Sequence, residues 1–452
     1  MADVIAAIAT ALAPSAIGVV RLSGDGAVQT AERMFAPRRG GRLSDAPDRK
    51  MILGDLLDER GRTLDEILAV VARGPHSYTG EDTVEFQCHG SPAVLAAALR
   101  AAFAAGARQA GPGEFTKRAF LNGQMDLTQA EAVADLIEAQ TADAAVCAAG
   151  QLGGAIRRKI RPVYDGLVDI LAHFHAVLDY PDEDIEPFRL EQFRQSVTGW
   201  RDSLRTLEDT FDRGRILKHG VKAVILGSPN AGKSSLLNAL AGYDRVIVTD
   251  VAGTTRDAVE ETVLLDGLAV RLLDTAGIRR TADAVEGMGV DIARQAAETA
   301  DVALFVCDGA RPLTEEDRMA MAEARKAPRA LAVVNKSDLP LTVTAADLPF
   351  SDVVILSAKT GAGLEDLSGI LRRWYVGGAP DGEILTNARQ QEAVRRARQS
   401  LEAMLLSMAE KQTPDAVLLD AEAALEALGE LTGQTMRREV VERIFERFCV
   451  GK

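Results

Sequence analysis

The chain has 452 residues, of which 47% are hydrophobic and 4% aromatic, and its formal net charge is −14. A chain of this length exceeds what one hydrophobic core usually serves, so several domains are expected. The negative charge argues against a broad basic surface for nucleic acid. A role on nucleic acid therefore requires a local basic patch or a partner.

The sequence has no pattern typical of a membrane span, a signal peptide or a set of paired cysteines. No apolar run reaches the roughly 20 residues that a membrane-spanning helix needs, and the first residues lack the positively charged start of a signal peptide. The four scattered cysteines show neither metal-ligand spacing nor a disulfide framework. We expect a cytoplasmic protein that makes no contact with a membrane.

Residues 1–117 show an α/β pattern. Short apolar runs separated by Gly, Pro and Asp predict strands at residues 17–22, 51–53, 67–72 and 83–88. An Ala/Leu pattern predicts a helix over residues 92–105. The polar loop that carries Tyr78 is interpreted as a turn entering a strand.

The pattern becomes helical after residue 113. Thr128 and Glu131 have the spacing of a capping box, which predicts the start of a long helix. Helical pattern continues to about residue 178 and resumes near residue 190. It returns near the C-terminus, in the ranges 387–410, 413–428 and 437–448. The two helical flanks predict one domain into which another is inserted. The expected segments are 1–117 (α/β), 118–214 (helical, first part), 215–376 (nucleotide domain) and 377–452 (helical, second part).

Residues 227–234, Gly-Ser-Pro-Asn-Ala-Gly-Lys-Ser, follow an apolar run and precede a helical pattern. This strand–loop–helix context is typical of a phosphate-binding P-loop. Gly227 and Gly232 let backbone N–H groups face an anion, Lys233 supplies charge for the β/γ-phosphates, and Ser234 offers a hydroxyl to Mg²⁺. A chance glycine turn is the simpler alternative, but it does not account for the whole pattern. The sequence predicts that a nucleoside triphosphate binds here.

The base is predicted from Asn335-Lys336-Ser-Asp338, which follows an apolar run. A carboxylate at Asp338 can accept two N–H groups of guanine, a donor pair that adenine lacks. Residues 357–359, Ser-Ala-Lys, are expected to close over the base. A helix-capping Asp is the alternative. The combination with the P-loop predicts guanine.

Residues near the γ-phosphate are predicted from Asp274-Thr-Ala-Gly277 and from Gly253-Thr-Thr-Arg-Asp. Asp274 is expected to orient Mg²⁺ through water, and Thr255 to reach Mg²⁺ when the γ-phosphate is present. Ile278 stands where Ras-like proteins have a water-orienting Gln. Hydrolysis must then recruit another side chain, a cation or a partner, and Glu286 is the candidate side chain.

Together these motifs resemble the MnmE (TrmE) family of tRNA modification GTPases. The resemblance spans the whole chain and includes residues 229–235, 253–257 and 274–279 and the terminal Phe-Cys-Val-Gly-Lys at 448–452. It implies a multidomain α/β plus all-α fold. The parts are an N-terminal folate-binding and dimerisation domain, a helical domain, and an inserted Ras-like P-loop GTPase domain with a doubly wound, mostly parallel sheet.

The resemblance also implies an activity. Members of the family form homodimers and join a flavoprotein, MnmG (GidA), in a heterotetramer. They couple GTP hydrolysis to aminomethyl or carboxymethylaminomethyl modification at C5 of the wobble uridine (U34) of certain tRNAs. The one-carbon donor would be 5,10-methylene- or 5-formyl-tetrahydrofolate.

Site residues follow from the resemblance position by position. Mg²⁺ would be held by Ser234 and Thr255, and a stimulating K⁺ by Asn230, Thr249, Val251 and Thr254. Glu286 would orient the water. The full predicted GTP set is Asn230, Ala231, Gly232, Lys233, Ser234, Ser235, Thr249, Thr254, Thr255, Asp274, Thr275, Ala276, Gly277, Asn335, Lys336, Asp338, Ser357, Ala358 and Lys359.

Folate would contact Arg21, Glu85, Gln124 and Lys452. Gln124 departs from the family, which often has Lys there, and so lacks a positive charge. Cys449 is implied in the modification chemistry. Its alternative role is a small buried residue beside the apolar stripe of the last helix.

Two other functions fit parts of the sequence. An Era/Der-like ribosome-assembly GTPase would use GTP to control RNA binding, and would be expected to end in a basic RNA-binding domain. A folate-dependent one-carbon enzyme with a regulatory GTPase insert would turn over folate without tRNA.

Overall fold

The computed structural model describes residues 3–179, 189–243, 260–273, 298–376 and 382–451. The chain divides into two compact units. The first comprises Met1–Ile137, Gln151–Leu204 and Glu392–Lys452, and the second comprises Glu138–Gly150 and Arg205–Gln391. None of the helices in the described parts is long and apolar enough to cross a bilayer.

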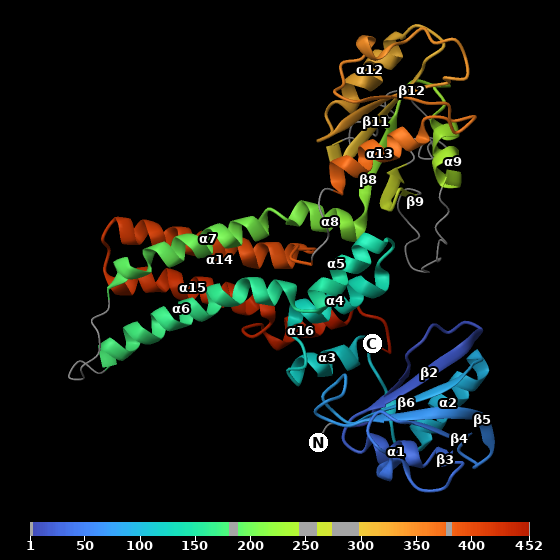
Figure 1. The fold of residues 1–452 in the computed structure, drawn as a ribbon, viewed down its shortest axis with the longest axis vertical. Coiled ribbons are helices and arrows are strands. Elements are labelled where there is room, and N and C mark those ends of the chain that lie inside the picture. The colour runs from blue at the N-terminus through green and yellow to red at the C-terminus, as the bar shows by residue number, and fades with distance from the viewer. Residues whose placement is uncertain (1–2, 180–188, 244–259, 274–297, 377–381, 452) are drawn as a thin grey trace. The chain divides into compact units, whose positions relative to one another are not determined.

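The N-terminal part of the first unit is a sheet in the order β3-β4-β5-β6-β2-β1-β7, antiparallel except for the β1–β7 pair. Its strands are β1 (Ile5–Ile8), β2 (Ser15–Ser23), β3 (Phe35–Pro37), β4 (Met51–Leu57), β5 (Thr63–Ala72), β6 (Thr83–Gly90) and β7 (Arg108–Gln109). Helices α1 (Ala27–Glu32) and α2 (Pro92–Ala104) share its main core, and the short 3₁₀ helix η1 covers Leu43–Asp45 (Figure 1). The four predicted strands and the predicted helix are confirmed. Strands β1, β3 and β7 were not predicted.

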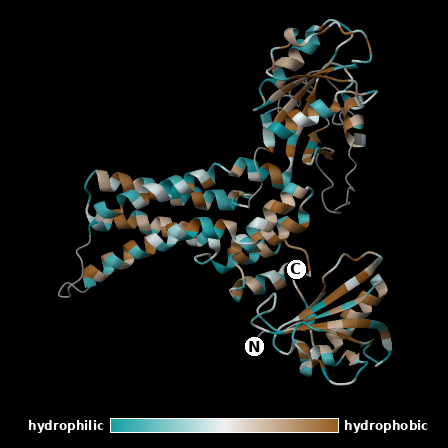
Figure 2. Cartoon of the chain, viewed as in Figure 1, coloured by the Kyte–Doolittle hydropathy of each residue, from teal (hydrophilic) through white to brown (hydrophobic). Residues whose placement is uncertain are grey.

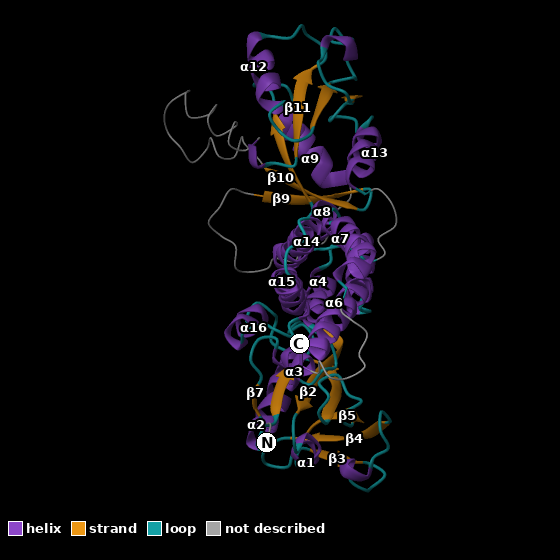
Figure 3. Ribbon diagram, turned by 90° about the vertical axis from the view of Figure 1, so that its left-hand side faces the viewer, coloured by secondary structure: helices purple, strands orange, loops and turns teal. Residues whose placement is uncertain are grey.

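The helical part follows the expected ranges but is more divided. Its helices are α3 (Glu114–Leu121), α4 (Leu127–Glu138), α5 (Ala142–Leu152), α6 (Ala155–Asp179), η2 (Leu190–Phe193), α7 (Arg194–Glu208), α8 (Phe211–His219), α14 (Ala388–Ala409), α15 (Pro414–Thr432) and α16 (Arg438–Phe445). The long helices α6 and α15 pack side by side (Figures 1 and 3). Helix α6 buries Ile156, Ile160, Val163, Leu167 and Ile170, a spacing that places one apolar stripe against its neighbours.

The predicted capping box at Thr128 and Glu131 is wrong. Asp126 caps α4 instead, because its Oδ1 accepts hydrogen bonds from Gln129 N (3.0 Å) and Thr128 Oγ1 (2.6 Å). Gln129 Oε1 returns a bond to Asp126 N at 3.1 Å. The reciprocal pair therefore lies two residues earlier than predicted, and both Thr128 and Glu131 are buried within the helix.

The nucleotide domain lies within the second unit. Its sheet has the order β13-β12-β11-β8-β10-β9, and β9 alone runs antiparallel to its neighbour. The strands are β8 (Val221–Leu226), β9 (Glu260–Leu265), β10 (Leu268–Leu273), β11 (Val302–Asp308), β12 (Ala330–Asn335) and β13 (Val353–Ile355). The helices are α9 (Lys233–Tyr243), α12 (Glu315–Ala324) and α13 (Leu364–Tyr375), with the 3₁₀ helix η3 at Ala345–Asp347.

This sheet is covered on both faces. In β11, Val302, Leu304 and Val306 join the core that includes α9 and α13, while the alternating Ala303, Phe305 and Cys307 join the core that includes α12. Two buried faces explain why the strand is a continuous apolar run, and Figure 2 shows such hydrophobic strands at the centre of the domain. The predicted doubly wound, mostly parallel fold is confirmed.

Candidate functional site

The P-loop connects β8 to α9, at the carboxyl edge of the parallel strands. At Gly227 a Cβ atom would lie 2.1 Å from the carbonyl oxygen of Val306, and at Gly232 one would lie 2.2 Å from Asn335 Nδ2. Gly232 also has a φ of 96°. Both positions therefore require glycine, which lets the loop backbone approach its neighbours closely.

Lys233 turns back over the loop that precedes it. Its Nζ donates to the carbonyl oxygens of Gly227 (2.8 Å) and Ser228 (2.7 Å). Ser234 and Ser235 are exposed in the first turn of α9, where the helix N-terminus favours an anion. A glycine cradle, an ammonium group and exposed hydroxyls at a helix start fit the phosphates of a nucleotide.

Asn335 is the residue that joins the loops of this site. Its side chain is only 2% exposed. Nδ2 donates to the carbonyl oxygen of Ala231 at 3.0 Å, while Oδ1 accepts from Lys336 N at 2.8 Å and from Ala358 N at 3.0 Å. One amide thus connects the P-loop, the Asn-Lys-x-Asp loop and the Ser-Ala-Lys loop, which the sequence had predicted as separate contacts to GTP.

Asp338 lies on the base side of the same arrangement. Its Oδ1 accepts a hydrogen bond from Ser357 Oγ at 2.7 Å, and this bond holds the pKa of Asp338 below its ordinary value. Asp338 is exposed and Ser357 is buried. The carboxylate is therefore ionised and oriented, and its second oxygen is available to the guanine ring of a nucleotide.

A supporting network behind the P-loop was not predicted. Arg311 donates to Ser228 Oγ (2.9 Å) and to Asp317 Oδ2 (2.8 Å). Lys336 Nζ donates to Asp308 Oδ2 at 2.6 Å. Burial raises the pKa of Asp308, but the bond from Lys336 outweighs it and the pKa is lowered. The signal that could have identified Asp308 is its place at the end of a buried parallel strand.

A second polar site lies on the N-terminal sheet. Arg21 on β2 and Glu85 on β6 stand directly opposite each other, with Nε and Oε1 2.7 Å apart. The Arg21 guanidinium lies 5.5 Å from the ring centroids of both Tyr78 and Phe115. Tyr78, assigned only to a turn from the sequence, donates to or accepts from Thr116 Oγ1 at 2.8 Å, and burial raises its pKa. A planar ligand could therefore meet a cation, an anion and two rings here.

The C-terminal tail reaches this sheet. Val450 pairs with Pro112, Gly113 N donates to the Cys449 carbonyl at 3.2 Å, and a Cβ at Gly451 would lie 2.3 Å from Ile8 O. Cys449 is exposed and follows the end of α16, so the alternative of a buried residue on the last helix is wrong. The tail ends beside β1, the strand that pairs with β2.

Gln124 lies against the loop that carries Tyr78. A Cβ at Gly80 would be 3.0 Å from Gln124 Nε2. Of the predicted folate contacts, Arg21 and Glu85 thus touch directly, and Gln124 contacts a loop that contributes Tyr78 beside them.

Comparisons with known proteins agree over the whole chain. The model of the MnmE helical domain matches residues 127–449, and that of the GTP-binding protein TrmE N-terminus matches residues 4–124. The tRNA modification GTPase MnmE of Symbiobacterium thermophilum is 43% identical over 456 residues, covering 100% of this chain and 99% of the relative. That of Aquifex aeolicus is 42% identical over 454 residues, covering 100% of both chains. The chain belongs to the MnmE family of tRNA modification GTPases.

Membership of the MnmE family confirms the resemblance drawn from the sequence, and with it the prediction of a GTP-hydrolysing enzyme. The residues predicted near the γ-phosphate and one folate contact lie outside the described residues and stay predictions. They are Thr249, Val251, Thr254, Thr255, Asp274, Thr275, Ala276, Gly277, Glu286 and Lys452.

Proposed function

We propose that this chain uses GTP hydrolysis to drive modification at C5 of the wobble uridine of tRNA, with the flavoprotein MnmG (GidA) and a folate one-carbon donor. Two observations support this proposal. The chain belongs to a family of tRNA modification GTPases, and its P-loop, its Asn-Lys-x-Asp loop and its Ser-Ala-Lys loop are joined by hydrogen bonds to Asn335. A separate polar site at Arg21 and Glu85 gives the folate a place away from the nucleotide.

In the nucleotide site, Ser234 and Thr255 would hold Mg²⁺. Asn230, Thr249, Val251 and Thr254 would hold K⁺, which when bound supplies positive charge against the phosphate oxygens in the transition state. Asn230 supports this assignment, because it is exposed and has a φ of 63°, a conformation that Asn tolerates. Glu286 would orient the water, since Ile278 cannot.

In the folate site, Arg21 suits a glutamate carboxylate and Glu85 suits the N–H donors of a pterin. Gln124 and Lys452 would complete the contacts, and Cys449 would take part in the modification chemistry. The exposure of Cys449 and the close approach of Gly451 to Ile8 on β1 of the N-terminal sheet support this assignment. The proposal includes a cytoplasmic homodimer, a heterotetramer with the flavoprotein, and the domain bounds 1–117, 118–214, 215–376 and 377–452.

The first test is GTP hydrolysis by the full chain in K⁺ and in Na⁺ at equal ionic strength. We expect a large K⁺-specific acceleration that is lost in Glu286→Ala and kept in Glu316→Ala, an exposed carboxylate on α12 that serves as the control. Equal rates in the two salts would refute the K⁺ assignment and favour a nucleotide switch of the Era/Der type.

The second test is modification of tRNA, followed by mass spectrometry of its nucleosides. The modified uridine should require this chain, the flavoprotein, GTP and the folate donor together. Folate turnover without tRNA or flavoprotein would instead support the one-carbon enzyme alternative.

A further inference from the structure

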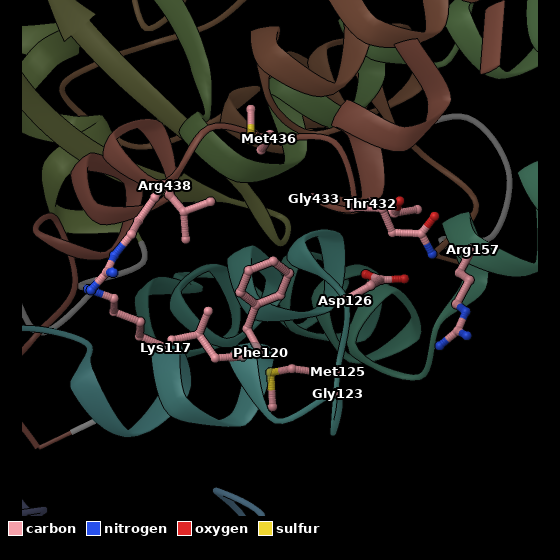
Figure 4. Close-up of a pocket in the computed structure, with 13 residues that line it drawn as sticks. Lys117, Phe120, Gly123, Met125, Asp126, Arg157, Thr432, Gly433, Met436 and Arg438 are labelled. Carbon is pink, nitrogen blue, oxygen red and sulfur yellow. The ribbon is translucent and has the colours of Figure 1, made fainter. Parts of the chain in front are cut away.

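A cavity of about 490 Å³ opens in the first unit between the α3–α4 turn and the α15–α16 turn (Figure 4). This volume is within the range of ligand pockets, roughly 300–1,000 Å³. The residues that line it include none of the positions predicted to bind GTP or folate. The proposed function therefore assigns no role to this cavity.

The cavity carries positive charge although the whole chain is acidic. Lys117 and Arg438 lie together at one end, where they share one carboxylate oxygen of Glu442 at 3.3 and 3.2 Å. Arg157 lines the opposite end and is exposed, with no ion pair recorded to any described residue. The sequence required either a local basic patch or a partner for any role on nucleic acid, and the cations that line this cavity form such a patch in the described part of the chain.

Asp126 also lines the end of the cavity that holds Arg157. Its Oδ1 accepts the two hydrogen bonds that cap α4, and Oδ2 is covered by the protein without a hydrogen-bond partner. Because Oδ2 is covered, this carboxylate holds the start of the helix and offers no acceptor to a ligand in the cavity.

The middle of the cavity is apolar and suits a flat ring. Phe120 and Met436 line it on opposite sides in Figure 4, and the Phe120 ring points into it. Gly433 ends α15 in the left-handed conformation, with a φ of 86°, and a Cβ there would lie 2.7 Å from Phe120 Cζ. The glycine thus gives the Phe120 ring its place. Aromatic rings and thioether sulfur both pack well on the face of a base.

We propose that this cavity binds one unpaired nucleotide of the RNA substrate. The base lies against Phe120 and Met436. Its phosphate contacts Lys117 and Arg438, and a neighbouring phosphate contacts Arg157. The proposal rests on tRNA being the substrate. A fatty acid has a single carboxylate and would leave the cations at one end of the cavity without a partner, and a base stacked in a duplex has no free face for Phe120.

Cations near the cavity extend this surface along the strand. The first two turns of α6 carry Arg157, Arg158, Lys159 and Arg161, of which Arg157 lines the cavity and Arg161 pairs with Asp165. Helix α16 begins at Arg438, directly after Arg437. Such a run suits successive phosphates of a single strand.

The test measures binding of a tRNA transcript to the full chain by fluorescence anisotropy at several KCl concentrations. The double variant Arg157→Glu/Arg438→Glu should lose at least about tenfold in affinity, and its salt slope should fall by about 1.4, which is about 0.7 for each of two phosphate contacts on a single strand. The control Arg100→Glu/Arg318→Glu changes the same charge at exposed residues outside the cavity and should bind like wild type. Matching melting temperatures would show that both are folded.

Phe120→Leu tests the base contact alone. Leu keeps an apolar side chain but removes the ring on which the base stacks, so affinity should fall about tenfold with no change in salt slope.

The outcomes separate this inference from the proposed function. If wild type binds tRNA and the cavity variants bind like the control, the cavity proposal is wrong and the proposed function stands. If wild type neither binds nor modifies tRNA, both are wrong. Uridine monophosphate serves as the probe for a free nucleotide. Its micromolar binding, with tRNA affinity unchanged in the double variant, would overturn the assignment to RNA.

Discussion

In the nucleotide domain a buried neutral amide, Asn335, joins three loops, whereas in the N-terminal domain a partly exposed ion pair, Arg21–Glu85, joins two adjacent strands. The amide side chain belongs to a residue only 2% exposed, while the two charged side chains are 15% and 33% exposed. Removing a buried amide leaves its partners unpaired, but removing a solvated charge costs little. The nucleotide domain therefore depends on a residue of its site for stability, whereas the N-terminal sheet does not depend on Arg21 and Glu85.

The largest effect is expected from Asn335→Ala. Three backbone groups, Ala231 O, Lys336 N and Ala358 N, lose their partner, so the free energy of unfolding of the nucleotide domain should fall by about 3 kcal/mol. The affinity for GTP should fall at least about 100-fold, because the three loops are no longer held in position relative to one another. This loss corresponds to about 1.4 kcal/mol for each factor of ten. Hydrogen exchange of β11 and β12 amides and titration with a fluorescent GTP analogue measure the two effects.

Ser337→Ala is the matched control, since no hydrogen bond of its hydroxyl is recorded in the described structure. If Asn335→Ala and this control gave equal exchange and equal affinity, the amide would not be the link between the loops.

Asp338→Asn tests the base-reading part of the same site. The carboxylate already accepts from Ser357, and its other oxygen is expected to accept from guanine. Losing a charged acceptor should weaken GTP binding by about 2–3 kcal/mol, while binding of xanthosine triphosphate, whose C2 carbonyl can accept from Asn, should improve. Competition binding with both nucleotides gives the ratio. An unchanged preference for guanine would show that another group reads the base.

The sequence predicted the two sites unequally, for a physical reason. The nucleotide loops are short contiguous motifs that follow buried strands, so Lys233, Asn335 and Asp338 could be placed from spacing alone. The role of Asn335 as a link, and the contact of Arg311 with Ser228, depend on which strands are neighbours. No local pattern carries that information.

The N-terminal site draws one residue from each of several elements. Strand β1 escaped prediction because Ile5–Ile8 is a short Ala/Ile run with no alternation. Tyr78 was assigned to a turn, since its neighbour Arg21 is distant in sequence. The cap of α4 was misplaced because Thr128 and Asp126 both suit an N-cap, and burial of Thr128 decided between them.

Glu114 is a charged residue of the N-terminal region that, unlike Arg21 and Glu85, is expected to stabilise the fold. Its carboxylate accepts from Arg108 (2.6 Å), Arg118 (3.0 Å) and Gly111 N (2.8 Å). Burial raises its pKa, but these bonds prevail and lower it from 4.5 to about 2. Stability from this group is thus complete above the unfolded pKa and is lost as the pH falls from about 4.5 towards 2.

We expect Glu114→Gln to lower the free energy of unfolding by about 2 kcal/mol at pH 7, a value reduced for the half-exposed Arg108. The difference from wild type should shrink as the pH falls below 4.5. Hydrogen exchange of β1 and β2 amides at pH 7 and pH 3.5 measures it. Glu446→Gln, an exposed residue after α16, is the control. A difference that did not change with pH would mean that lost packing, and not charge, explains the effect.

The smallest effect on stability is expected at the ion pair itself. Arg21→Gln, Glu85→Gln and the double variant should each change the free energy of unfolding by less than about 1 kcal/mol, because both groups keep access to water. Affinity for tetrahydrofolate should nevertheless fall at least about tenfold in each single variant, since each charge is proposed to meet a different end of the ligand. Calorimetric titration and hydrogen exchange of β2 and β6 separate the two quantities. Loss of stability without loss of folate binding would reverse the comparison, because the pair would then hold the sheet together and not the ligand.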